Sequence, residues 1–194
     1  MKSLSITEAI QYLGEDKYAV SLENDRYRRI LYRVGDGADK SERVARFFDP
    51  NPLEFSYVLL SIADWLPKST HRLLWIDYCT DGFPSQKPHF LKILGDDLPS
   101  DHLVANPAIL LGPFSDDLTD QQAGTPEQII ESEALVILST LLCIGHWDAK
   151  LLTNGSTDYV EFWEGNVLFY SESTEALDRA AELLDFYELK TPWD

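Results

Sequence analysis

The chain has 194 residues, of which 44% are hydrophobic and 12% aromatic, enough apolar material for the core of one domain. Residues 1–50 carry equal numbers of acidic and basic side chains, so the whole net charge of −17 lies in residues 51–194. This negative charge repels nucleic acids and anionic membrane surfaces, and it favours binding to a basic partner. We therefore expect that the protein does not bind DNA, RNA or membranes.

The first residues, MKSLSITEAIQYLG, lack the apolar run and the cleavage site of a signal peptide. No segment approaches the roughly 18 apolar residues of a membrane helix. Cys79 and Cys143 are the two cysteines, which is typical of free thiols in a reducing compartment. We therefore expect a cytoplasmic protein with a single domain over residues 1–194.

Two helices are predicted within residues 1–50. In SITEAIQYLG, Ser5 and Glu8 have the spacing of a capping box, and Gly14 follows the apolar stripe. In ENDRYRRILYRVG the apolar residues recur at helical spacing, which predicts a helix over 24–34. The sequence thus predicts a helical N-terminal region, 1–50, packed on the rest of the domain.

The middle of the chain alternates helices and strands. NPLEFSYVLLSIADWLP, with Asn51 as N-cap and Pro52 at the first helical position, predicts a buried helix that ends at Pro67. HRLLWIDYC over 71–79 predicts an interior strand. A helix over 86–95 and a short strand over 108–112 are expected to follow.

The C-terminal third has the clearest signals. Thr125, Pro126 and Gln128 begin a long apolar helix that Gly145 ends. Three strands are predicted in WDAKLLT and DYVEFWEGNVLFYS, with Asn154-Gly155 as a hairpin signal, and an amphipathic helix over 173–189 follows. The expected fold is α/β to α+β: a mixed sheet of about five strands covered by helices, with C-terminal hairpins and a final helix.

A cysteine, a histidine and an aspartate lie close together in CIGHWDAKLLTNG. Cys143 falls on the last turn of the predicted helix, whereas Asp148 begins a strand, so the two side chains point in different directions. His146 can donate to the free carbonyls of the helix end. No second Cys/His cluster completes a metal site, and we interpret this stretch as structural.

A second candidate is the stretch DYCTDGFPSQKPHF, after the first interior strand. Cys79 or Ser85 paired with His89 is the weak catalytic candidate, since nucleophilic catalysis needs a base within hydrogen-bond reach. The structural interpretation makes Ser85 a helix cap and Gly82-Phe83-Pro84 a turn. Because no nucleophile elbow or catalytic-cysteine motif is present, we favour the structural interpretation.

Acidic residues offer candidates of a third kind. The loop carboxylates lack calcium-loop spacing, and no glycine loop for phosphate is present, so no metal or cofactor is expected. Arg26, Arg29 and Arg33, on one face of the predicted helix, are expected to pair with carboxylates.

The side chains of residues 159–163 alternate between the two faces of a predicted strand, so one of the two sets is expected to be exposed. Exposed Tyr and Trp side chains beside acidic residues are typical of a protein-binding surface. The candidates for partner binding are Asp96, Asp97, Asp116, Asp117, Asp120, Tyr159, Glu161 and Trp163.

The stretches LLWIDYCTDGFPS, GPF and GHWDAKLL…DYVEFW resemble a group of small, uncharacterised bacterial proteins with an "LLWI…G…PS" strand-turn and a later "GWDA-LL" strand. The resemblance covers residues 71–170. This chain departs by His146 before Trp147 and by GPF where the group often has GHLF, which removes a histidine that would be a natural catalytic candidate. In general character the group is similar to immunity proteins of bacterial toxin systems.

The expected function is an acidic protein-binding module, such as an immunity protein that neutralises a basic toxin. This expectation rests on the charge asymmetry and on the absence of a catalytic signature. The contact is expected to come from carboxylates within 96–120 and 158–188 and from anchors such as Trp163. The alternatives are a small hydrolase that uses Cys79 or Ser85 with His89, and a structural subunit of a homo-oligomer. The sequence leaves the oligomeric state open.

Overall fold

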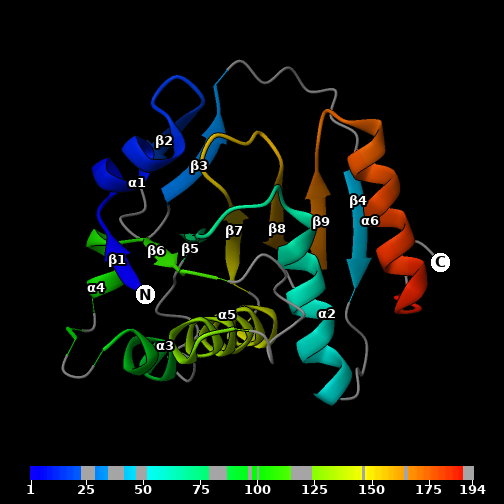
Figure 1. Cartoon of the computed structure of the whole chain (residues 1–194). Coiled ribbons are helices and arrows are strands. Elements are labelled where there is room, and N and C mark those ends of the chain that lie inside the picture. Colours follow the sequence, from blue (N-terminus) through cyan, green and yellow to red (C-terminus); the bar gives the residue numbers. More distant parts are fainter. Residues whose placement is uncertain are drawn as a thin grey trace.

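A computed structural model of the chain describes residues 1–22, 29–34, 42–46, 52–78, 87–95, 98–99, 101–114, 124–145, 147–163 and 166–189. These residues form one seven-stranded sheet, a two-stranded sheet and the helices around them (Figure 1). The strands are β1 (Lys2–Leu4), β2 (Tyr18–Leu22), β3 (Arg29–Arg33), β4 (Glu42–Arg46), β5 (Arg72–Tyr78), β6 (Ala108–Leu111), β7 (Asp148–Leu152), β8 (Tyr159–Trp163) and β9 (Asn166–Tyr170). The helices are α1 (Ile6–Leu13), α2 (Pro52–Trp65), α3 (Lys87–Leu94), α4 (His102–Ala105), α5 (Pro126–Gly145) and α6 (Thr174–Phe186).

The large sheet has the strand order β1-β6-β5-β7-β8-β9-β4, and every pairing in it is antiparallel. Its centre is built from segments far apart in the chain, since β5 lies between β6 and β7. β2 and β3 form a separate antiparallel hairpin. The register aligns Trp75, Lys150 and Glu161 across β5, β7 and β8, so these three side chains share one face of the sheet.

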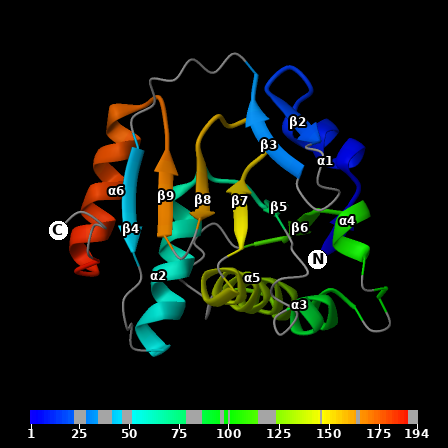
Figure 2. The same ribbon diagram turned by 180° about the vertical axis from the view of Figure 1, so that it is seen from behind.

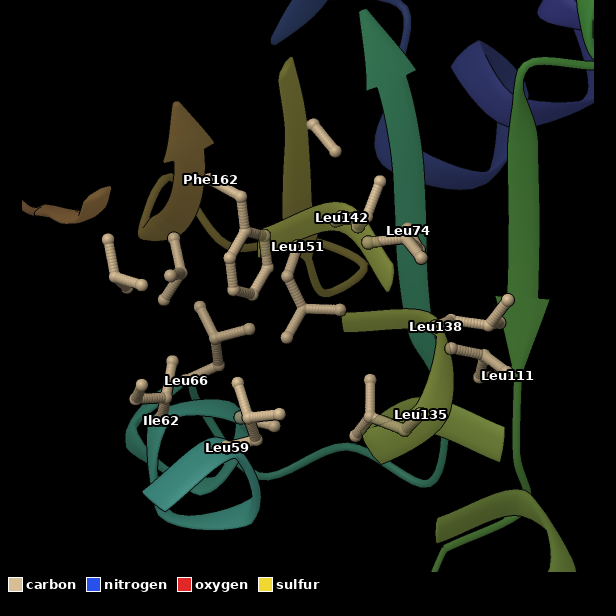
Figure 3. Packing of buried hydrophobic residues seen from close by; sticks show 14 of the residues in the cluster. Leu59, Ile62, Leu66, Leu74, Leu111, Leu135, Leu138, Leu142, Leu151 and Phe162 are labelled. Atoms are coloured by element: carbon tan, nitrogen blue, oxygen red, sulfur yellow. The ribbon is translucent and has the colours of Figure 1, made fainter. Parts of the chain in front are cut away.

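One face of the sheet packs against α2, α3, α5 and α6. In Figure 1 α2 crosses in front of the strands, and in Figure 2 the strands lie in front of it. Figure 3 shows leucines and isoleucine of the α2 segment and leucines of α5 directed at the apolar side chains of β5, β6, β7 and β8. The labelled residues of this core are Leu59, Ile62, Leu66, Leu135, Leu138, Leu142, Leu74, Leu111, Leu151 and Phe162.

The opposite face is covered in part by α1 and the β2–β3 hairpin. Tyr18 and Leu31 of the hairpin pack with Trp75 and Leu152 of the central strands in a second apolar cluster. The Trp75 indole N–H donates to the backbone carbonyl of Arg29 at 2.8 Å. Both clusters therefore share the same central strands, one on each face.

The predicted fold class is confirmed, and so are the helices over 52–65, 87–94, 126–145 and 174–186 and the strands β5 to β9. Among the described residues, no helix has the length and apolar character needed to cross a membrane. The sheet has seven strands where about five were predicted, because β1 and β4 at its two edges were not recognised. It is antiparallel in each of its pairings and not mixed.

Of the two helices predicted within residues 1–50, the first is present as α1, whereas the helix predicted over 24–34 is wrong in the part that the structure describes. Residues 29–33 form a strand whose partner is 18–22, paired from Tyr18 with Arg33 to Leu22 with Arg29. Leu31 is buried, whereas Tyr32 and Val34 are exposed. The apolar spacing that suggested a helix thus arises from a strand with apolar residues on both faces. Arg26 lies outside the described residues.

The capping box of α1 is present as predicted. The Ser5 side chain accepts from the Glu8 N–H, and the Glu8 carboxylate accepts from the Ser5 N–H at 2.9 Å. The bonds from Ser5 and from Lys2 lower the pKa of Glu8 from 4.5 to about 2.

Ser5→Ala is expected to lower the free energy of unfolding by about 1 kcal/mol, since a backbone N–H of α1 loses its acceptor. Because the pKa of Glu8 is lowered in the folded state, its contribution is complete above pH 4.5 and is lost as the pH falls toward 2. Urea unfolding of both proteins at neutral and acid pH measures this. A wild-type advantage that stays unchanged at pH 2 would contradict the role given to Glu8.

Candidate functional site

In the stretch CIGHWDAK, the structure describes all residues except His146. Burial raises the pKa of the Cys143 thiol to about 12, so the nucleophilic thiolate is scarce at neutral pH. Trp147 is buried against Phe90, with ring centroids 5.2 Å apart.

Of the second candidate stretch, the structure describes residues 77–78 and 87–90. Asp77 is buried within β5, whereas His89 is exposed on α3. Cys79 and Ser85 lie outside the described residues, so neither proposed nucleophile is placed against His89. Among the described residues, no group of three or more His, Cys, Asp or Glu side chains is arranged to hold a metal ion.

Asp77 belongs instead to a buried charge cluster, which we define as Asp77, Lys150 and Glu161. The Lys150 ammonium pairs with the Asp77 carboxylate and lies 3.1 Å from Glu161 Oε1. The other Asp77 oxygen accepts from the backbone N–H of Leu31 in β3 at 2.7 Å. The cluster thereby ties the hairpin to the central sheet.

The electrostatics of this cluster follow from two carboxylates that share one ammonium. Burial raises the pKa of Asp77 even though Lys150 and the Leu31 N–H oppose the shift. Burial by itself would lower the pKa of Lys150, but the carboxylates of Asp77 and Glu161 outweigh it and raise that pKa. Lys150 therefore stays charged at neutral pH and holds the cluster together.

Of the partner-binding candidates predicted within residues 159–163, one is exposed. Tyr159 is buried and its ring stacks on Tyr170 at 4.6 Å, so it is not available to a partner. Glu161 is engaged by Lys150. Trp163, at the end of β8, is 46% exposed and remains available. The loop carboxylates Asp96, Asp97, Asp116, Asp117 and Asp120 lie outside the described residues.

The arginines Arg29 and Arg33 lie on β3 and not on a helical face. Arg33 pairs with the exposed Glu172 carboxylate, and it also donates to the carbonyl of Thr157 at 3.3 Å. The predicted pairing with a carboxylate is thus confirmed for Arg33, although the element that carries it is a strand.

A second charged feature, within the range 158–188 whose carboxylates were expected to contact a partner, is the outward face of α6 and the turn after it, which we call the acidic face. Residues 172–189 contain six acids and one base, Arg179. The carboxylates of α6 follow one another at spacings of three and four, so that they are neighbours on the helix surface. The exposed members of the acidic face are Glu175, Asp178, Glu182, Asp185 and Glu188.

Two exposed aromatic side chains lie on α6 and on the neighbouring helix α2. Phe186 is 79% exposed at the end of α6, and its ring lies edge-on to that of Tyr187. The Tyr187 hydroxyl is 2.8 Å from the Ser61 hydroxyl of α2. Tyr57, one helical turn before Ser61 and so on the same side of α2, is 56% exposed. We call Tyr57 and Phe186 the aromatic seam between α2 and α6, helices that pack side by side (Figure 1).

One sequence signal could have identified the exposed ring of Phe186 on this surface. The buried stripe of α6 contains Ala176, Ala180 and Leu184, and Phe186 falls outside that stripe. A large apolar residue out of phase with the buried face of an amphipathic helix is expected on the surface.

The acidic face carries a stability cost at the C-terminal end of α6. No basic residue occupies the last turn, so Asp185 faces the negative end of the helix dipole. Asp185→Asn is expected to raise the free energy of unfolding by about 0.3–1 kcal/mol. Glu175→Gln, a matched change in the first turn, is expected to lower it slightly, because a carboxylate is favourable there. Thermal unfolding at low salt compares the two variants; equal effects of the same sign would contradict this account.

Comparisons with protein-family models, with curated proteins and with solved structures found no significant match to this chain.

Proposed function

We propose that the protein is a binding module for a basic protein partner. Binding, and not catalysis, best accounts for the described surface, because its outstanding exposed features are carboxylates and aromatic rings. An immunity protein that neutralises a basic toxin is one form of such a module, and we place its action in the cytoplasm.

The observation that carries the proposal is the acidic face of α6. It places five exposed carboxylates against one exposed base, Arg179, on the surface of α6 and the turn after it, and the like charges of neighbouring carboxylates repel one another in the free protein. A basic partner relieves that repulsion on binding. Electrostatic complementarity of this kind speeds association and selects against acidic partners.

The hydrolase alternative gains no support from the described residues. His89 is exposed on α3, and its two proposed nucleophiles, Cys79 and Ser85, lie outside the described residues.

The test is a pull-down from native lysate with the tagged protein, followed by purification of the retained protein and titration at about 0.05 M and about 0.5 M salt. We expect one basic partner whose dissociation constant rises at least tenfold at the higher salt, as for other charge-dominated encounters (about 1.4 kcal/mol). Retention of no partner, or binding that does not change with salt, would remove the proposal.

A further inference from the structure

We propose that the aromatic seam and the C-terminal half of the acidic face together form the docking site, and that its occupant is a lysine- and arginine-rich segment of a protein partner. This assignment rests on the proposed function and specifies where on the molecule it takes place. It concerns Tyr57, Phe186, Glu182 and Asp185.

The first argument is that Phe186 of the seam and the carboxylates of the acidic face are adjacent. Asp185 precedes Phe186 directly, and Glu182 lies one turn earlier on the same helix. Tyr187 joins this end of α6 to α2 through its hydroxyl contact with Ser61. An incoming side chain at this end of α6 therefore meets an aromatic ring and a carboxylate together.

The second argument is the chemistry of the pair. The face of an aromatic ring attracts a guanidinium or ammonium group, and a neighbouring carboxylate can accept its hydrogen bonds. Arginine satisfies both at once, because its planar guanidinium stacks on a ring while its N–H groups reach a carboxylate. The combination selects a cationic partner over a purely apolar one.

The third argument excludes a second copy of this chain as the occupant. A symmetric dimer through α6 would place two acidic faces opposite each other. Like charges in such a contact are unfavourable. Charge complementarity therefore favours a basic partner protein.

The experiment uses the full chain and a synthetic amphipathic peptide of about four helical turns, with arginine and leucine at helical spacing. A peptide with glutamine in place of each arginine is the control for charge. Affinity is measured at low and high salt for the wild type, for Phe186→Ala and for the double variant Glu182→Gln/Asp185→Asn. These side chains are exposed, so the variants are expected to fold, and unfolding curves verify it.

Matched control variants come from α5. Ile137→Ala removes an exposed apolar side chain, and Glu127→Gln/Glu133→Gln removes the same charge as the double variant on α6. We expect each α6 variant to weaken binding of the arginine peptide about tenfold or more at low salt. The α5 variants are expected to change it by less than about twofold, as for contacts outside an interface centre.

Three outcomes would overturn the assignment. Equal losses from the α5 and α6 variants would show that net charge alone binds the peptide, which removes this site but leaves the proposed function standing. No binding by the wild type at low salt would remove both. If sedimentation shows that the wild type is a dimer and that Phe186→Ala is a monomer, the aromatic seam binds a second copy of the chain and not a basic partner.

Discussion

Lys150→Met is expected to lower the free energy of unfolding by about 3–5 kcal/mol, because it leaves two carboxylates without their ammonium. Asp77 is 4% exposed and cannot recover the lost pairing from solvent. The change also weakens the docking of β3, since the Asp77 carboxylate that accepts the Leu31 N–H loses its counter-charge. The midpoint of urea unfolding measures the effect.

The double variant Asp77→Leu/Lys150→Met serves as the control for this prediction. It removes both buried charges together, and a buried ion pair replaced by apolar groups is often close to neutral in stability. We expect it to be more stable than Lys150→Met alone. Glu172→Ala, which breaks the exposed pair with Arg33, is expected to cost less than about 1 kcal/mol. A loss from Lys150→Met as small as that from Glu172→Ala would show that the cluster does not hold the fold together.

Gly112→Ala is expected to lower the free energy of unfolding by about 3–5 kcal/mol, from backbone strain and overpacking. Gly112 has φ of +128°, and a Cβ atom there would lie 2.4 Å from the carbonyl oxygen of Thr70. That oxygen cannot move away readily, because it accepts from the Phe114 N–H at 2.8 Å. The Gly112 N–H is itself held by the Glu131 carboxylate at 3.0 Å.

Gly155→Ala provides the matched control for Gly112→Ala. Gly155 also has a positive φ, of +77°, but a Cβ atom there has no heavy atom within 4 Å. Its replacement therefore costs only backbone strain, about 1–2 kcal/mol. Urea unfolding of the two variants separates strain from the clash with Thr70. Equal losses would show that the space around Gly112 adapts to a side chain.

The sequence predicted those elements whose signals are local. For example, capping residues at their first turns predicted α1 and α5, and continuous apolar runs predicted α2 and β5. Each of these signals lies within or directly beside the element that it specifies. β1 and β4 could not be found in this way, because each is a short edge strand whose partner lies more than 100 residues away, as in the pairing of Val44 with Leu168. The hairpin of β2 and β3 was missed because its apolar residues imitate helical spacing.

The candidate sites depended on contacts that no local pattern gives. Asp77 begins the candidate stretch DYCTDGFPSQKPHF, but its partner Lys150 is 73 residues further along the chain and becomes its neighbour only through the pairing of β5 with β7. Tyr159 was predicted to be exposed because Tyr159, Glu161 and Trp163 alternate along the strand with apolar residues. Both faces of the central sheet are covered over part of its area, so alternation there does not distinguish the buried side from the exposed one.

Amide hydrogen exchange of the full chain, alone and with the basic partner bound, tests the central claim most directly. The account predicts slower exchange in α6, in the turn that follows it and in the first turns of α2, and unchanged exchange in α5. Slower exchange confined to α5 or to the β2–β3 hairpin would contradict the assignment of the docking site to α2 and α6.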